Sequence, residues 1–175
     1  LSAIAFAEPA QNPESMISLP DTIAGFQRIS FKDYRKEKPG LGVSYGYRAA
    51  SGLTATVYIY NLGLTEIPSG IESQALKKLH VQTVSEIMQL GATRGMAFEH
   101  TLKASIAVPT KQGKKYALVD AFMAKDGKGQ TDTFLWLWAA KNNFFKIRLT
   151  ANPHDAFDKK EVSSFSTEVI RISYE

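Results

Sequence analysis

The chain has 175 residues, 44% of them hydrophobic and 22% charged, which suits one folded domain and excludes a disordered chain. It contains no cysteine, which excludes disulfides, thiolate metal sites and a cysteine nucleophile. The net charge is +4, but the lysines gather near predicted turns without a basic helix or a recognition motif, so we expect no nucleic-acid partner. The alternative role for these lysines is a positive rim for another anionic partner, such as a lipid headgroup or a glycan.

The first residues have the pattern of the end of a secretion signal. Ala5-Phe6-Ala7 follows small apolar residues and precedes Glu8-Pro9, as in the A-x-A sites that signal peptidase cleaves. We therefore predict a residual signal peptide over 1–7, a flexible segment over 8–20 and one domain over 21–175, in a periplasmic or otherwise exported protein. No later stretch approaches the about 20 apolar residues of a membrane span, so we expect that the mature protein does not cross a membrane.

The first half of the domain predicts strands. Residues 23–34 alternate loosely between apolar and polar side chains, which favours a strand. Residues 43–60 predict a β-hairpin with two tyrosines in each arm. Because strand side chains alternate between faces, Tyr45 and Tyr47 share a face with Val43.

The turn of this hairpin decides which side chains share a face. A three-residue loop, Ala50-Ser51-Gly52, pairs Tyr47 with Ala55 and gathers the aliphatic side chains and the first two tyrosines on one face. A two-residue turn slips the register and brings Tyr45 opposite Tyr58. We prefer the three-residue loop because it makes one coherent apolar face.

Two segments predict amphipathic helices. Residues 71–90 place their apolar side chains on one stripe, and Gly91 supplies a stop signal. The second helix is predicted to open at Pro153-His154-Asp155, with Phe157 and Phe165 toward the same side.

The region between the helices predicts three or four strands. Residues 94–108 are one candidate, and residues 115–151 hold further strands joined by turns at 126–129 and 142–143. Residues 133–140 are apolar at nearly every position, as in a strand covered on both faces. The predicted class is therefore α+β, with a mainly antiparallel sheet of about six to seven strands and two main helices packed on it.

This order of elements resembles the fold shared by the photosystem extrinsic protein PsbP and its bacterial relatives. The resemblance spans roughly residues 20–173 and implies a PsbP-like α/β sandwich. The text "GVSYGYR…TATVYIYNLGLTEIP" also resembles exported bacterial proteins of unassigned activity. The activities in the PsbP-like group, which include assembly, binding and toxin immunity, imply binding more readily than catalysis.

The sequence predicts no catalytic residue, no metal site and no cofactor. The serine-hydrolase text G-x-S-x-G is absent, and the three histidines, His80, His100 and His154, lack metal-ligand spacing. His80 lies at the edge of the apolar stripe of the first helix, which is typical of a structural histidine.

Asp120 is the one acid inside the apolar run "ALVDAFMA". It can point to a polar face, pair with an internal cation or belong to a pocket. Lys146 and Arg148 in "FFKIRLT" can reach it if the two strands share a face. We expect a structural ion pair first and a ligand-anchoring pair second.

Arg48, Tyr58 and Tyr60 form the remaining candidate site, because tyrosine offers an apolar body with a polar end and arginine can stack or bind an acid. Together with Asp120 and Arg148, they predict a non-enzymatic exported protein that binds a protein or small-molecule ligand. The alternatives are an immunity protein against a secreted toxin and a hydrolase with a site around Asp120 and one histidine.

Overall fold

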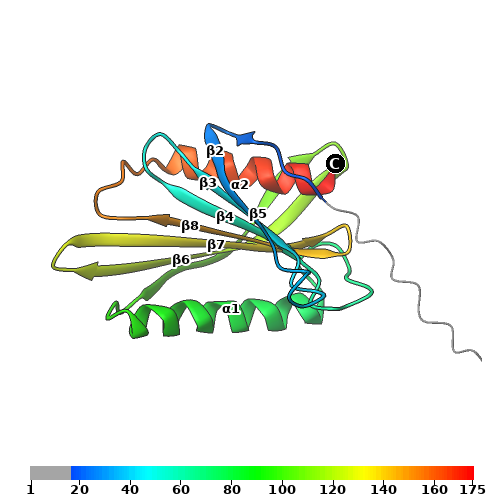
Figure 1. Ribbon diagram of the computed structural model, residues 1–175, viewed down its shortest axis with the longest axis horizontal. Helices are drawn as coiled ribbons and strands as arrows, with labels where there is room; N and C mark the ends of the chain where they lie inside the picture. Colours follow the sequence, from blue (N-terminus) through cyan, green and yellow to red (C-terminus); the bar gives the residue numbers. More distant parts are fainter. Residues whose placement is uncertain (1–16) are drawn as a thin grey trace, which may run out of the picture.

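The computed structural model describes residues 17–175, and the predicted signal-peptide region, 1–7, lies outside them. One eight-stranded antiparallel sheet carries a helix on each of its faces (Figure 1). The strand order is β1-β2-β3-β4-β8-β7-β6-β5. The elements are β1 (Thr22–Ile23), β2 (Phe26–Asp33), β3 (Val43–Arg48), β4 (Thr54–Tyr60), α1 (Gln74–Thr93), β5 (Glu99–Thr110), β6 (Gly113–Asp126), β7 (Gly129–Ala140), β8 (Asn143–Ala151) and α2 (Lys159–Tyr174).

The structure confirms the α+β class with an antiparallel sheet, but the predicted count of six to seven strands is wrong. The predicted strand over 23–34 is broken at Ala24 and Gly25, which have φ angles of 46° and 86°. Left-handed backbone at two successive residues reverses the chain, so Thr22–Ile23 folds back onto Phe26 as a separate short strand. The region between the helices contributes four strands, within the three or four that the sequence predicts, so the extra strand is β1.

The larger core lies between the sheet and α2. Phe165 of α2 is fully buried and packs against Phe26 and Tyr47, with ring centroids 4.4 and 5.5 Å away. Trp136 and Trp138 of β7 face the same side. Leu135 and Leu137 face α1, so β7 is covered on both faces, as its apolar run predicts.

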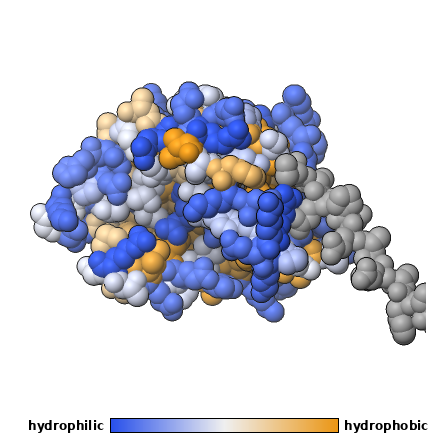
Figure 2. Space-filling model, in the orientation of Figure 1, coloured by the Kyte–Doolittle hydropathy of each residue, from blue (hydrophilic) through white to orange (hydrophobic). Residues whose placement is uncertain are grey.

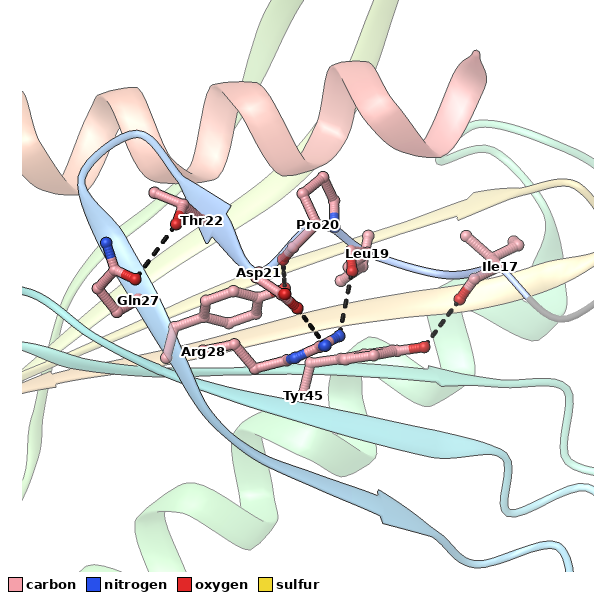
Figure 3. Close-up of polar contacts among 9 residues, drawn as sticks. Ile17, Leu19, Pro20, Asp21, Thr22, Gln27, Arg28 and Tyr45 are labelled. Carbon is pink, nitrogen blue, oxygen red and sulfur yellow. Dashed lines mark hydrogen bonds and ion pairs between the residues drawn. The ribbon is translucent and has the colours of Figure 1, made fainter.

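Residues 17–20 belong to the folded unit, although the sequence analysis placed them in a flexible segment before it. These residues lead into β1 along the α2 side of the sheet (Figure 3). There the hydroxyl groups of Tyr47 and Tyr45 donate hydrogen bonds to the carbonyls of Pro20 and Ile17, at 2.7 and 3.1 Å. Leu19 is buried between them. These two tyrosines therefore have a structural role.

The hairpin register is the one that the three-residue loop predicts. Tyr47 pairs with Ala55 and Tyr45 with Val57. Gly52 has φ +98°, a conformation that residues with a Cβ rarely adopt. The turn therefore sends Tyr58 and Tyr60 to the face covered by α1.

Both predicted helix limits need correction. Helix α1 continues through Gly91, whose missing side chain lets the Phe98 ring pack closely, and the left-handed glycine after the helix is Gly95. Helix α2 begins at Lys159, after its N-cap Asp158, rather than at Pro153. The chain at 152–155 instead forms a tight turn closed by the Asp155 carboxylate.

The helices and the surface show how the apolar residues are distributed. Neither helix of residues 17–175 has the length and apolar character needed to cross a membrane. On the face shown in Figure 2, hydrophobic side chains form small separate patches between hydrophilic ones. Exposed apolar residues that lie close together include Ile29 and Phe31 on β2.

Candidate functional site

The sheet face covered by α1 carries the candidate polar residues. Strand β4 pairs with β8, so that Tyr58 lies opposite Lys146 and Thr56 lies opposite Arg148. Because side chains two residues apart share a face, Lys146 and Arg148 both project toward the α1 side. The register thus brings two cations of β8 beside two tyrosines of β4.

Tyr58, Tyr60, Lys146 and Arg148 form what we call the cationic–aromatic cluster. The Lys146 ammonium lies over both rings, with Nζ 4.6 Å from the centroid of Tyr58 and 5.6 Å from that of Tyr60. Tyr60 is buried, and this burial raises the pKa of its phenol well above the usual range. Tyr60 is therefore a neutral phenol at physiological pH.

Arg148 is the most unusual member of this cluster. Its side chain is half-buried, and its Nε atom is fully buried without a hydrogen-bond partner, alone among side-chain atoms of residues 17–175. Burial lowers the pKa of Arg148, and the charge of Arg94 lowers it further, while Tyr58 opposes this effect. A buried cationic donor without an acceptor is costly, so this position is not explained by stability.

Lys146 shares this environment. Burial is the largest cause that lowers its pKa, the nearby Arg148 adds to the effect, and Glu86 of α1 opposes it. Among residues 17–175, no carboxylate lies within ion-pair distance of either Lys146 or Arg148. The cluster therefore has a surplus of buried positive charge.

Arg48 lies at the margin of this cluster. It shares the α1 side with Thr54, its partner across the β3–β4 ladder, and Thr54 is two residues from Thr56, the partner of Arg148. Strand spacing puts the Cα atoms of Arg48 and Arg148 about 12 Å apart. At this separation, both arginine side chains can reach the same bound anion. Arg48 is exposed, so it can move toward a ligand.

Asp120 lies apart from these residues, on β6, and forms a second cluster with His80 and His100. His80 Nε2 is 2.5 Å from Oδ2 of Asp120, and His100 Nε2 is 2.8 Å from Oδ1. Asp120 is fully buried, and the side chains of His80 and His100 are 9% and 28% exposed. The three residues come from α1, β5 and β6.

The chemistry of this Asp120 cluster follows from its donors. A carboxylate only accepts hydrogen bonds, so each histidine donates its Nε2–H to one oxygen. No serine or threonine hydroxyl in residues 17–175 is hydrogen-bonded to either ring, so neither histidine of this cluster activates a hydroxyl nucleophile there. No group of three or more acid and histidine side chains in that range is arranged to hold a metal ion. We interpret the cluster as a buried polar clamp between α1 and the sheet.

The expected ion pair between Asp120 and Arg148 does not form. The two residues share the α1 side, as the sequence suggested, but β7 runs between β6 and β8. Leu135 of β7 pairs with both of them and fills the space between their side chains. Asp120 instead takes its partners from the other direction, namely His100 on β5 and His80 on α1.

The predicted site residues leave out three members of these clusters, Lys146, His80 and His100. The sequence suggests Lys146 only as a partner for Asp120, although its position two residues before Arg148 already puts both cations on one strand face. It suggests a histidine beside Asp120 only in the hydrolase alternative. The separations of His80 and His100 from Asp120, 40 and 20 residues, leave no local pattern that joins them.

Comparisons of the sequence with protein-family models and with curated proteins find no match.

Proposed function

We propose that the protein is a non-enzymatic binding protein whose cationic–aromatic cluster takes an anionic ligand. The observation that carries this proposal is Arg148, with a buried, unpartnered Nε atom beside the second cation Lys146. A carboxylate or phosphate on a ligand supplies the missing acceptor, and two-pronged binding of such groups is the usual role of arginine. The ring of Tyr58 offers an apolar surface for the rest of the ligand.

Two other functions were weighed at the sequence level. A hydrolase needs a nucleophile and a base in one pocket, whereas no serine or threonine hydroxyl of residues 17–175 is hydrogen-bonded to the two histidines of the Asp120 cluster. An immunity protein binds through a broad exposed patch, whereas the hydrophobic residues in Figure 2 are scattered. Both observations favour ligand binding at the cationic–aromatic cluster.

The substitution Arg148→Met tests this function. We expect the affinity for an aromatic acid, with 3-phenyllactate as the probe, to fall by about 10- to 100-fold, since a charge-assisted hydrogen bond contributes about 1.5–3 kcal/mol. We also expect Tm to stay equal or rise, because the substitution removes an unpaired buried cation. Titration calorimetry and thermal unfolding measure the two effects.

Lys103→Met is the matched control for this experiment. Lys103 projects from β5 in the same cross-strand row, on the far side of Asp120, and is exposed. Its loss should leave the affinity for 3-phenyllactate unchanged. A fall in Tm for Arg148→Met, with no measurable binding by the unmodified protein, would mean that Arg148 has only a structural role.

We infer that this binding takes place outside the cytoplasm, which rests on the Ala5-Phe6-Ala7 motif. In its own cells the protein should then appear in the envelope fraction with Glu8 as its first residue. N-terminal sequencing of the fractionated protein checks this. Recovery of a cytoplasmic protein that retains Ala7 would exclude the inference.

A further inference from the structure

Lys146 differs from the other lysines of the chain. Apart from Lys146 and Lys115, every lysine is exposed. Lys115 is half-buried too and lies 5.1 Å from the ring centroid of Tyr174, but it projects toward α2, on the opposite face of the sheet. Lys146 alone combines a half-buried amine, two aromatic rings and an arginine two residues away on the same strand face.

Burial and the charge of Arg148 favour the neutral amine of Lys146, whereas the rings of Tyr58 and Tyr60 favour its ammonium form. A lysine attacks a carbonyl group only in its unprotonated form, and desolvation or a neighbouring cation increases the share of that form. Both causes act on Lys146, where burial and Arg148 lower the pKa and Glu86 only partly offsets them. Among residues 17–175, no carboxylate forms an ion pair with Nζ, so a ligand that reaches Nζ displaces only its contacts with the two tyrosine rings.

We propose that Lys146 forms an imine with the carbonyl group of a 2-oxo acid whose carboxylate is bound by Arg148. This inference rests on the proposed function, since it uses the same anion site. Lys146 and Arg148 are two residues apart on one strand face, with Cα atoms about 7 Å apart. A ligand with adjacent carbonyl and carboxylate groups fits this spacing, and an aromatic substituent fits the ring of Tyr58.

The reaction balances without an oxidant or a reductant. The neutral Nζ atom attacks the carbonyl carbon, and the carbonyl oxygen takes up a proton to give a carbinolamine. The hydroxyl group takes up a second proton and leaves as water, and the amine returns its two protons to solvent, which leaves a C=N bond between ligand and lysine. Because Lys146 is only half-buried, solvent water can carry these protons.

Reductive trapping on the unmodified full chain tests the proposal. The protein is incubated with phenylpyruvate and cyanoborohydride, which converts an imine into a stable secondary amine, and the modified lysines are mapped by peptide mass spectrometry. We expect trapping at Lys146 to be at least 10-fold faster than at Lys115, the internal control. An excess of 3-phenyllactate, which has no carbonyl group, should slow trapping at Lys146 only.

The outcomes separate this inference from the proposed function. Equal labelling of Lys146, Lys115 and the exposed lysines overturns the imine proposal. If 3-phenyllactate still binds in that case, the anion site stands without covalent chemistry. If neither acid binds and Lys146 is unlabelled, both proposals fail. Arg148→Met should reduce trapping most at low phenylpyruvate, as expected of a residue that binds the carboxylate. A smaller reduction should remain at high concentration, because the charge of Arg148 also lowers the pKa of Lys146.

Discussion

Replacement of Asp120 by alanine is expected to lower the free energy of unfolding by about 3–5 kcal/mol, because removing one partner of a buried charged network leaves the others uncompensated. Asp120 is fully buried and accepts hydrogen bonds from His80 and His100. Without it, both Nε2–H donors lose their acceptor in a place that water reaches poorly. Urea unfolding followed by circular dichroism measures the loss.

The two histidines give a graded series for the same test. The side chain of His80 is 9% exposed and that of His100 is 28% exposed, so water can replace the lost partner more easily at His100. We expect His80→Ala to cost more than His100→Ala. Asp132→Ala is the control, since Asp132 on the neighbouring strand β7 bonds only the exposed Gln130 among the described residues. If the free energy of unfolding of Asp120→Ala lies within about 0.5 kcal/mol of that of the unmodified protein, Asp120 does not clamp α1 to the sheet.

The Asp120 clamp also bears on the binding site. It ties α1 to the sheet through His80, and the same helix carries Glu86, whose charge acts on Lys146. A loosened α1 should therefore also weaken ligand binding at the cationic–aromatic cluster. If Asp120 has only a local role, Asp120→Ala should leave the affinity for 3-phenyllactate unchanged.

The hairpin of β3 and β4 shows how far local sequence goes. Strand alternation assigns each tyrosine to a face, and a glycine suited to positive φ fixes the length of the turn. Both signals lie within a few residues, and the structure confirms the register that they predict. Tyr45 and Tyr47 then serve the fold, which leaves Tyr58 and Tyr60 as the tyrosines of the site.

The errors arise where the deciding contact is distant. The break at Ala24 and Gly25 is not visible in the loose alternation of residues 23–34, because it depends on where the N-terminal segment crosses the sheet. The neighbours of Asp120 depend on the strand order, which puts Leu135 between it and Arg148. The period of the hydrophobic residues predicts on which face of the sheet a side chain lies, but it does not predict which strand is the neighbour.

Replacement of Phe165 by alanine is expected to have an effect on stability as large as that of Asp120→Ala. Phe165 is fully buried where α2 packs on the sheet, and its ring contacts Phe26 and Tyr47. Large-to-small substitution of a buried aromatic residue costs about 3–5 kcal/mol, from lost burial and from the cavity that remains. Urea unfolding gives the free energy, and an unchanged slope of the transition would show that the folded state keeps its compactness.

Phe157→Ala is the matched control, and it separates helix packing from general loss of an aromatic ring. The sequence analysis placed Phe157 and Phe165 on one face of a helix that opens at Pro153. Since the helix begins only at Lys159, Phe157 lies before it, 39% exposed and stacked on Phe134. We expect its loss to cost about 1 kcal/mol, the size of an aromatic pair near the surface. Equal costs for the two substitutions would mean that α2 is not anchored through Phe165, and the core on the α2 side would then depend on Trp136 and Trp138.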